Sequence, residues 1–564
     1  MNTKFIKTAL IVIILAVTSC SDDFLNRFPT DSLNSENFWH NENELKQYAN
    51  DFYRVFVGHA TGTSGSPIIT GDNQSDNMVP LDFNLIAAGK NIVPTSGGGW
   101  DWQVVRSCNY FLTRYNQTPV GKEIKEKYAG EVRFFKVLNY FEKVKDFGDV
   151  PWLSKDLELN SPELYTPRDS RIMVMDSLLA TINAAILGLP DKASAEEGRI
   201  NKDIALLVKA RMCLFEGTYR KYRNIAGSEK FLQEAASASQ RLITEGHYQI
   251  HNTGKPTVDY ASLFNSIDLN GNKEMIMFKA YITGLLGTAT SWNLQSNNFN
   301  TSASKSLIES YLCVDGKPIS QSDLYLGDKT IQSEMTNRDP RLNQTITFPG
   351  TGIQTSSKIP AISGSGISGV GIVPTGYQIQ KFWVEDQQEY VRIQNGILDA
   401  PIFRYAEVLL INAEANAELG SATQETIDKT INLLRKRAGM PNMVIANLVK
   451  DQKSDFPSLP VLLDEIRRER RVELAIEALR YDDLVRWKAG SLLNKPVLGM
   501  KFIQSVYPKA VIGSSIYVNA DGYILPYGKS LPTGRTYDED RSYLLPLPLD
   551  ELALNPALKQ NPGW

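Results

Sequence analysis

The sequence predicts a mainly α-helical protein, in which a scaffold of helix pairs carries a loop-rich, irregular part. Two observations support this prediction. Apolar residues recur every three to four positions through most of the segments 40–60, 100–250 and 400–490, as amphipathic helices require. The segments 61–99 and 281–384 are instead rich in Gly, Ser, Thr, Asn and Asp and lack that period. Because long structureless loops are uncommon in compact domains, we expect short helices, strands and hairpins there.

The individual helices are bounded by residues that suit helix ends. We expect helices over 43–60, 102–115, 123–145, 168–187, 201–219, 229–244, 406–419, 424–438 and 461–488. Three of them, 168–187, 406–419 and 424–438, are followed directly by a glycine, the residue that most readily adopts the left-handed conformation after a last turn. Neighbouring helices form pairs similar in size to tetratricopeptide (TPR) repeats. Because no clean 34-residue TPR consensus recurs, a non-repetitive helical bundle is the alternative.

Composition and charge exclude several classes of protein. The chain has 564 residues, of which 42% are apolar, which excludes a disordered or collagen-like chain. Its 60 Lys and Arg residues nearly balance 63 Asp and Glu residues, giving a net charge of −3. Such a chain has no strong positive electrostatic field that would attract nucleic acid, so we expect no nucleic-acid partner. The four cysteines form no CxxC pair, which argues against a zinc or redox motif.

The N-terminus is interpreted as a targeting signal rather than part of the fold. Lys4 and Lys7 precede the apolar run 8–18, which is too short for a bilayer but suits a signal peptide. The run ends at Ser19-Cys20 and resembles the lipobox of bacterial lipoproteins. We therefore predict a signal peptide over residues 1–19 and lipid attachment at Cys20. An ordinary signal peptide with an incidental cysteine is the alternative.

Two long C-terminal motifs carry a family resemblance. Residues 466–488 read IRRERRVELAIEALRYDDLVRWK and residues 543–564 read YLLPLPLDELALNPALKQNPGW. Four shorter segments support the resemblance and are, along the chain, CSDDFL at 20–25, FGDVPW at 147–152, DPRL at 339–342 and FRYAEVLLINAEANAELG at 403–420. Together they resemble the SusD/RagB family of Gram-negative surface lipoproteins, from the lipobox to the last residue.

The resemblance implies a fold, a function and a partner. The fold is a single body over 20–564, with TPR-like helix pairs and a loop-rich ligand side. The function is binding of an oligosaccharide or polysaccharide at the outer-membrane surface, or of peptide in some members. The partner is a TonB-dependent transporter of the SusC type. Family members have no catalytic chemistry, so we expect no enzyme activity and no cofactor.

The Arg/Glu-rich segment 461–488 has a structural and a ligand-binding interpretation. Four glutamates recur every four residues and would form one stripe on a helix: Glu465, Glu469, Glu473 and Glu477. Arg468 follows Asp464 by four residues and Arg470 precedes Glu473 by three, so local pairing is expected. We interpret the segment as an internal brace. A site for a charged ligand is the alternative.

Aromatic and polar residues in the loops are the candidate ligand contacts. Sugar rings stack on aromatic planes, while their hydroxyls need amide and carboxylate partners. Trp100, Asp101 and Trp102 follow three glycines and open a helix, and Trp292 lies in the second loop region. The polar candidates are Asn73 and Asp76. For Trp102 a position in the helix core is the alternative, and for 72–76 a solvated turn.

Three other functions compete with glycan binding. They are uptake of peptide, hydrolysis of polysaccharide by a surface-anchored enzyme, and protein-only binding by a TPR scaffold. Metal sites are not expected from the sequence, because His247 and His251 follow a helix-ending Gly246 and need not share a face. The acidic loop 72–76 is where a structural calcium ion would be sought.

Overall fold

The computed structural model describes residues 38–59, 66–295, 299–347, 361–363, 366–368, 372–384, 395–505, 507 and 510–564. The expected signal peptide and Cys20 lie outside these residues. Lipid attachment at Cys20 therefore stays a prediction.

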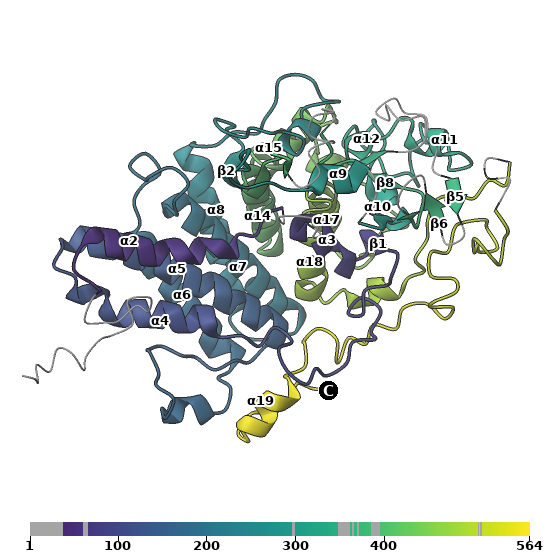
Figure 1. Ribbon diagram of the computed structural model, residues 1–564. Helices are drawn as coiled ribbons and strands as arrows, with labels where there is room; N and C mark the ends of the chain where they lie inside the picture. Colours follow the sequence, from purple (N-terminus) through teal and green to yellow (C-terminus); the bar gives the residue numbers. More distant parts are fainter. Residues whose placement is uncertain are drawn as a thin grey trace, which may run out of the picture.

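The first half of the chain forms a set of long helices that pack side by side (Figure 1). They are α2 (Glu42–Asp51), α4 (Gln103–Arg114), α5 (Lys122–Phe147), α6 (Arg171–Gly188), α7 (Lys202–Tyr222) and α8 (Ser228–Glu245). Each helix from α4 to α8 packs on the next one along the chain. The Asn201 side chain accepts from the first amides of α7, and Gly246 ends α8 in the left-handed conformation.

A second set of helices continues the same hydrophobic core. It comprises α14 (Tyr405–Glu418), α15 (Gln424–Asp428), α16 (Ile431–Arg437), α17 (Val461–Glu473) and α18 (Arg480–Arg486). Helix α14 packs against α7, α8 and α17, so one core runs through both sets. The predicted mainly α, helix-pair fold is thereby confirmed.

Much of the remaining chain folds around a second core, on the right in Figure 1. Its short helices are α3 (Pro67–Thr70), α9 (Thr290–Gln295), α10 (Lys305–Ser310), α11 (Ile331–Met335) and α12 (Leu342–Thr345). Its strands pair in antiparallel fashion. Three sheets have two strands each: β1 (Met78–Pro80) with β3 (Thr301–Ala303), β2 (Met275–Lys279) with β9 (Ala400–Arg404), and β4 (Ile346–Thr347) with β8 (Gln378–Ile379). A fourth sheet has the order β5 (Ala361–Ser363), β6 (Gly366–Ser368), β7 (Ile372–Val373).

Strand β2 joins the two cores. Successive side chains of a strand point to opposite faces. Met275 accordingly belongs to the second core, whereas Ile276 belongs to the core of the helical scaffold. The irregular part is therefore fixed to the scaffold by shared packing and not by a single flexible connection.

The C-terminal segment returns to the helical scaffold. After the short helix α19 (Leu549–Leu554), the chain end lies below the scaffold in Figure 1. The Leu545 amide donates to the carbonyl of Asp146 at 2.6 Å, and the Asn561 side chain donates to the carbonyl of Phe147 at 3.1 Å. Arg168 donates to the Asn561 side chain at 2.8 Å. The C-terminal motif thus covers the end of α5.

The single helix expected over 461–488 is in fact two helices. Between α17 and α18, Ile476 and Ala478 adopt φ values of 61° and 60°, which a right-handed helix cannot contain. The Asp72 carboxylate accepts from the amides of Ile476 at 2.8 Å and Arg480 at 3.4 Å. A Cβ on Gly71 would lie 2.3 Å from the Cβ of Ala478, so only glycine permits this approach.

Glu473, at the end of α17, is the centre of a buried ion cluster. Its carboxylate is fully buried and is paired with three arginines from three other segments, Arg341, Arg404 and Arg437. Although burial alone would raise the pKa of Glu473, these guanidinium groups hold it well below its usual range. These contacts support the interpretation of the Arg/Glu segment as an internal brace.

The local ion pairs expected on α17 are wrong. Arg468 donates to Asp451 at 2.8 Å and to Glu465 at 3.2 Å, not to the residue four positions before it. Arg470 donates to Asp483 at 2.9 Å, not to Glu473. Arg468 thus keeps one local partner, Glu465, three positions before it on the same helix. Its other partner and that of Arg470 lie on neighbouring segments, because the helix is buried between them.

One helix of the described residues, α6, is long and apolar enough to cross a membrane. It packs against α5 and α7. Its buried residues include Val174, Leu178 and Ile182, which recur every four positions along one face. Packing inside the scaffold accounts for the apolar character of that face.

Candidate functional site

Trp100, predicted as a ligand contact, lies in the core of the scaffold. Its side chain is only 7% exposed. It makes edge-to-face contacts with Phe147 at 4.9 Å and Trp102 at 5.2 Å between ring centroids. A buried ring with such contacts serves packing more readily than sugar stacking.

Trp102 and Asp101 occupy the start of α4. Trp102 is half-buried and faces Tyr140, with ring centroids 5.5 Å apart. Asp101 is exposed and accepts from the amide of Gln103 at 2.9 Å, which helps to begin the helix. Trp152 is also half-buried, and the centroid of its ring lies 4.8 Å from that of Tyr140. These rings form a partly exposed aromatic corner.

Asn73 and Asp76 hold the two parts of the molecule together. The Asp76 carboxylate is buried and makes ion pairs with Arg480 at 2.8 Å and Arg471 at 3.0 Å. Those arginines hold the pKa of Asp76 well below its usual range, although burial opposes them. The Asn73 side chain accepts from the Thr301 hydroxyl at 2.7 Å. Asn73 therefore contacts β3 and Asp76 contacts α17 and α18, whereas the Trp100–Trp102 group contacts α4 and α5.

Trp292 lies on α9 in the irregular part and is half-buried. The preceding hairpin exposes two large apolar side chains, Ile282 at 53% and Leu285 at 80%. In this short segment of the sequence, the half-buried Trp292 thus follows the exposed aliphatic side chains Ile282 and Leu285. Trp292 stays a candidate for ligand contact.

A cavity of about 410 Å³ lies where the scaffold meets the irregular part. This volume falls in the range of small-ligand pockets, ~300–1,000 Å³. Much of its wall is apolar and contains phenylalanines from both parts of the chain: Phe56, Phe135, Phe141, Phe382 and Phe403. No sequence pattern pointed to this cavity, because its lining comes from segments up to 427 positions apart, from Val55 to Asp482.

The charged groups of the cavity are paired with one another. Arg211 donates to both oxygens of Glu407, at 2.7 and 2.6 Å. Lys145 lies between two carboxylates, 2.9 Å from Glu142 and 2.7 Å from Asp482. These pairs fix polar groups around an apolar space, an arrangement that can orient a ligand.

Asn139 carries a buried polar atom without a hydrogen-bond partner beside the cavity. It lies on α5, and its Oδ1 atom is buried without a hydrogen-bond partner. An acceptor left unpaired in this way costs free energy, which a donor group of a ligand would recover. Hydroxyl groups are such donors, and the phenylalanine faces suit the apolar face of a sugar ring.

Comparison with known proteins identifies relatives over most of the chain. The profile of the SusD family matches residues 269–564. The starch-binding protein SusD of Bacteroides thetaiotaomicron is 24% identical over 581 aligned positions, covering 87% of this chain and 94% of that protein. The SusD-like protein P38 of Formosa agariphila is 22% identical, covering 89% of this chain and 95% of that protein.

Solved structures share the fold. A SusD-like carbohydrate-binding protein from Bacteroides fragilis superposes with a TM-score of 0.72 at 24% identity, over 93% of this chain and 100% of that one. A laminarin-binding SusD-like protein superposes with a TM-score of 0.58 at 19% identity, over the same shares of the two chains. With the family profile covering more than half of the sequence, this chain belongs to the SusD family.

Proposed function

We propose that this protein is a cell-surface lipoprotein that captures an oligosaccharide or polysaccharide and delivers it to a TonB-dependent transporter in the outer membrane. The observation that carries the proposal is the fold, which is shared over nearly the whole chain with a carbohydrate-binding and a laminarin-binding SusD-like protein. The expected lipid attachment at Cys20 supplies the anchor.

Two places in the structure support sugar binding. The first is the segment of Trp292 with its exposed apolar neighbours in the irregular part. The second is the cavity, in which the unpaired Asn139 Oδ1 atom lies among phenylalanine rings. Each offers an apolar surface beside polar groups, the combination that a sugar ring requires.

The arrangement favours binding over hydrolysis. A glycosidase needs two carboxyl groups that flank the bond to be broken, one of them able to give up a proton. In the cavity, Glu407 is held by Arg211, while Glu142 and Asp482 share Lys145. Carboxylates engaged in this way are poor proton donors, so we propose no enzyme activity.

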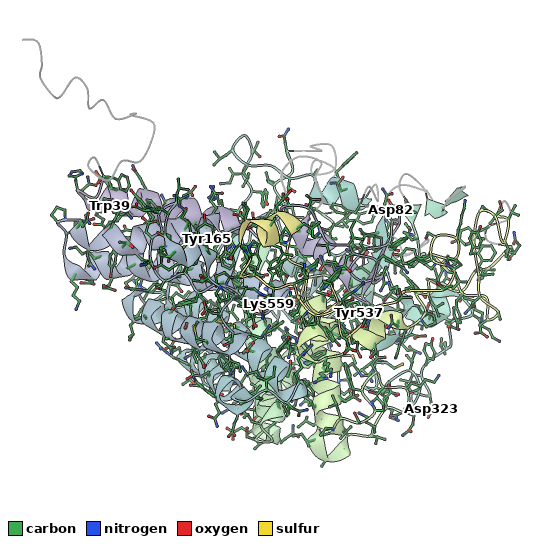
Figure 2. All side chains as sticks on the ribbon, turned by 90° about the horizontal axis from the view of Figure 1, so that it is seen from below. Trp39, Asp82, Tyr165, Asp323, Tyr537 and Lys559 are labelled. Atoms are coloured by element: carbon green, nitrogen blue, oxygen red, sulfur yellow. The ribbon has the colours of Figure 1, made fainter. Side chains whose placement is uncertain are left out.

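An exposed apolar patch supports the presence of a protein partner. It lies around the segment before α6 and helix α19, on the side viewed in Figure 2, where Tyr165 and Lys559 are labelled. Its members are exposed by 40% or more: Leu159, Leu164, Tyr165, Leu549 and Leu554. Asn555 ties the two segments together by donating to the carbonyls of Leu164 and Thr166. Patches of this kind mark interaction surfaces.

Peptide uptake is the second candidate, because the largely apolar wall of the cavity would also accept an apolar side chain. Titration calorimetry of the mature protein separates the two. The panel holds α-glucan, β-glucan and other oligosaccharides together with short peptides. Binding of a glycan alone supports the proposal, and binding of peptides alone assigns the protein to the second candidate.

Variants then locate the site. Trp292→Ala removes the half-buried aromatic side chain, and Asn139→Leu removes the unpaired acceptor. Loss of a stacked anchor should weaken glycan binding about thirtyfold, equivalent to ~2 kcal/mol. Tyr165→Ala, at an exposed aromatic residue on the apolar patch, is the matched control and should leave affinity unchanged. Unchanged affinity in both site variants would contradict the placement of the site but not glycan binding itself.

A further inference from the structure

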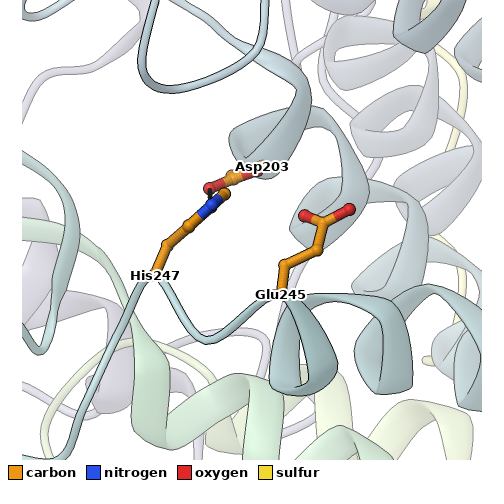
Figure 3. A group of neighbouring side chains, drawn as sticks. All are labelled: Asp203, Glu245 and His247. Atoms are coloured by element: carbon orange, nitrogen blue, oxygen red, sulfur yellow. Dashed lines mark hydrogen bonds and ion pairs between the residues drawn. The ribbon is translucent and has the colours of Figure 1, made fainter.

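Three side chains with metal-binding groups meet at one end of the α7–α8 pair (Figure 3). Asp203 is the second residue of α7, Glu245 is the last residue of α8, and His247 follows it after Gly246. The two helices pack closely along their lengths. The start of α7 therefore lies beside the end of α8, which brings together residues more than forty positions apart.

The three groups lie near enough to one another to converge on one ion. One ligand atom from each lies within 4.8 Å of the other two. His247 Nδ1 and Asp203 Oδ2 are 2.9 Å apart and share a hydrogen bond. Two ligands bound to one zinc ion at ~2.0–2.1 Å are separated by about 3.3 Å in a tetrahedron, so this pair needs little movement. Glu245 must approach further, and its long side chain is 30% exposed and able to turn.

Tyr248, next to His247, is only 3% exposed and adds a further polar side chain at this place. Its hydroxyl interacts with the Asp203 carboxylate and lies close to the charge of Glu245, so the tyrosine helps to hold Asp203 in place beside His247.

We propose that Asp203, Glu245 and His247 bind a zinc ion that clamps the end of α8 to the start of α7. An imidazole with two carboxylates suits zinc, whereas calcium and magnesium prefer oxygen ligands alone. On binding, the metal takes the place of the proton between Nδ1 and Oδ2, and the neutral imidazole carries its one ring proton on Nε2 after exchange with solvent. Three protein ligands leave a fourth position for water.

Neighbouring cations limit the affinity. Arg241 makes an ion pair with Glu245 at 2.6 Å, and Lys192 lies 3.7 Å from the centre of the Tyr248 ring. Zinc must displace the arginine from Glu245, so we expect a dissociation constant in the micromolar range. The inference departs from the sequence expectation of no metal, which paired His247 with His251 and did not consider Asp203 or Glu245.

The test is titration calorimetry of the mature protein, prepared without a histidine tag, with zinc chloride and separately with calcium chloride. The wild type should bind one zinc ion, and zinc should raise its melting temperature. Glu245→Gln and His247→Ala should each weaken binding tenfold or more and abolish the rise in melting temperature. Both side chains are partly exposed, so the variants should fold.

His251→Ala is the matched control. His251 lies four residues beyond His247 but outside the group of three, and it should retain full zinc binding. Three outcomes overturn the proposal: no zinc binding by the wild type, binding that survives in both Glu245→Gln and His247→Ala, or tighter binding of calcium than of zinc.

Discussion

The carboxylate of Asp72 accepts a hydrogen bond from the backbone amide of Ile476 at 2.8 Å. The bond joins the turn directly after α3 to the break between α17 and α18, more than four hundred positions later. Asp72 is fully buried and also accepts from the Asn77 side chain. One side chain thus satisfies several buried donors at the junction of scaffold and irregular part.

Replacing Asp72 with Ala should strongly destabilise the protein. The amides of Ile476 and Arg480 would lose their acceptor while remaining buried, and each unpaired group costs ~1–3 kcal/mol. We expect a loss of roughly 2–4 kcal/mol in the free energy of unfolding, measured by urea denaturation. Asp82→Ala, at an exposed aspartate, should change it by less than about 0.5 kcal/mol. Equal effects of the two substitutions would contradict the role of Asp72.

Trp100→Ala should lower stability rather than ligand affinity. Its ring packs on Phe147 in the core, and truncation of a buried Trp costs ~3–5 kcal/mol. The melting temperature should fall by several degrees, with glycan affinity retained in the folded protein. Trp292→Ala should instead lower glycan affinity with little loss of stability, since that side chain is half-buried. Loss of affinity without loss of stability in Trp100→Ala would return Trp100 to the binding site.

The long helices could be predicted from sequence because their apolar period and terminal glycines are local signals. The expected helix 123–145 corresponds to α5 at Lys122–Phe147, for example. The break after Glu473 could not be predicted. The segment 474–479 contains no proline or glycine, and the hydrogen bonds that stabilise its left-handed residues come from Asp72, far away in sequence.

The candidate site was harder to predict, for a related reason. Trp100 follows three glycines, a context that resembles an exposed loop, yet it packs against Phe147 from a helix 47 positions later. Asp76 appeared to lie in a solvated turn, but Arg480 makes it a buried ion pair. In both cases the partner that decides burial is remote in sequence and was not recognisable without the fold.

Cys20→Ala should release the protein from membranes. Cys20 ends the apolar run of the expected signal peptide, and lipidation there would provide two or more acyl chains for stable anchoring. Fractionation of cells after a high-salt wash should find the wild type in the outer membrane and the variant in the soluble fraction. Cys108→Ala is the control for loss of a cysteine elsewhere. Retention of Cys20→Ala in the membrane would contradict lipid anchoring at this residue.

The pH dependence of stability should change when Asp146 is replaced with Asn. Asp146 lies near the end of α5, and burial raises its pKa to about 7, helped by the charges of Glu142 and Asp482. Near pH 4 the group is protonated in the folded protein and about half protonated in the unfolded chain, so the two states still bind similar numbers of protons. As the pH rises toward 7 the unfolded chain ionises first, so the wild type loses stability over this range.

Asp146→Asn removes that loss. Its free energy of unfolding should therefore match the wild type near pH 4 and exceed it at pH 8, by on the order of 2 kcal/mol, since the side chain retains some contact with solvent. Thermal melting of both proteins at the two pH values measures the difference. Asp82→Asn, at an exposed carboxylate, should show no such divergence. A difference of equal size at pH 4 and pH 8 would mean that the substitution acts through packing, because ionisation of Asp146 can affect stability only where the folded and unfolded chains bind different numbers of protons.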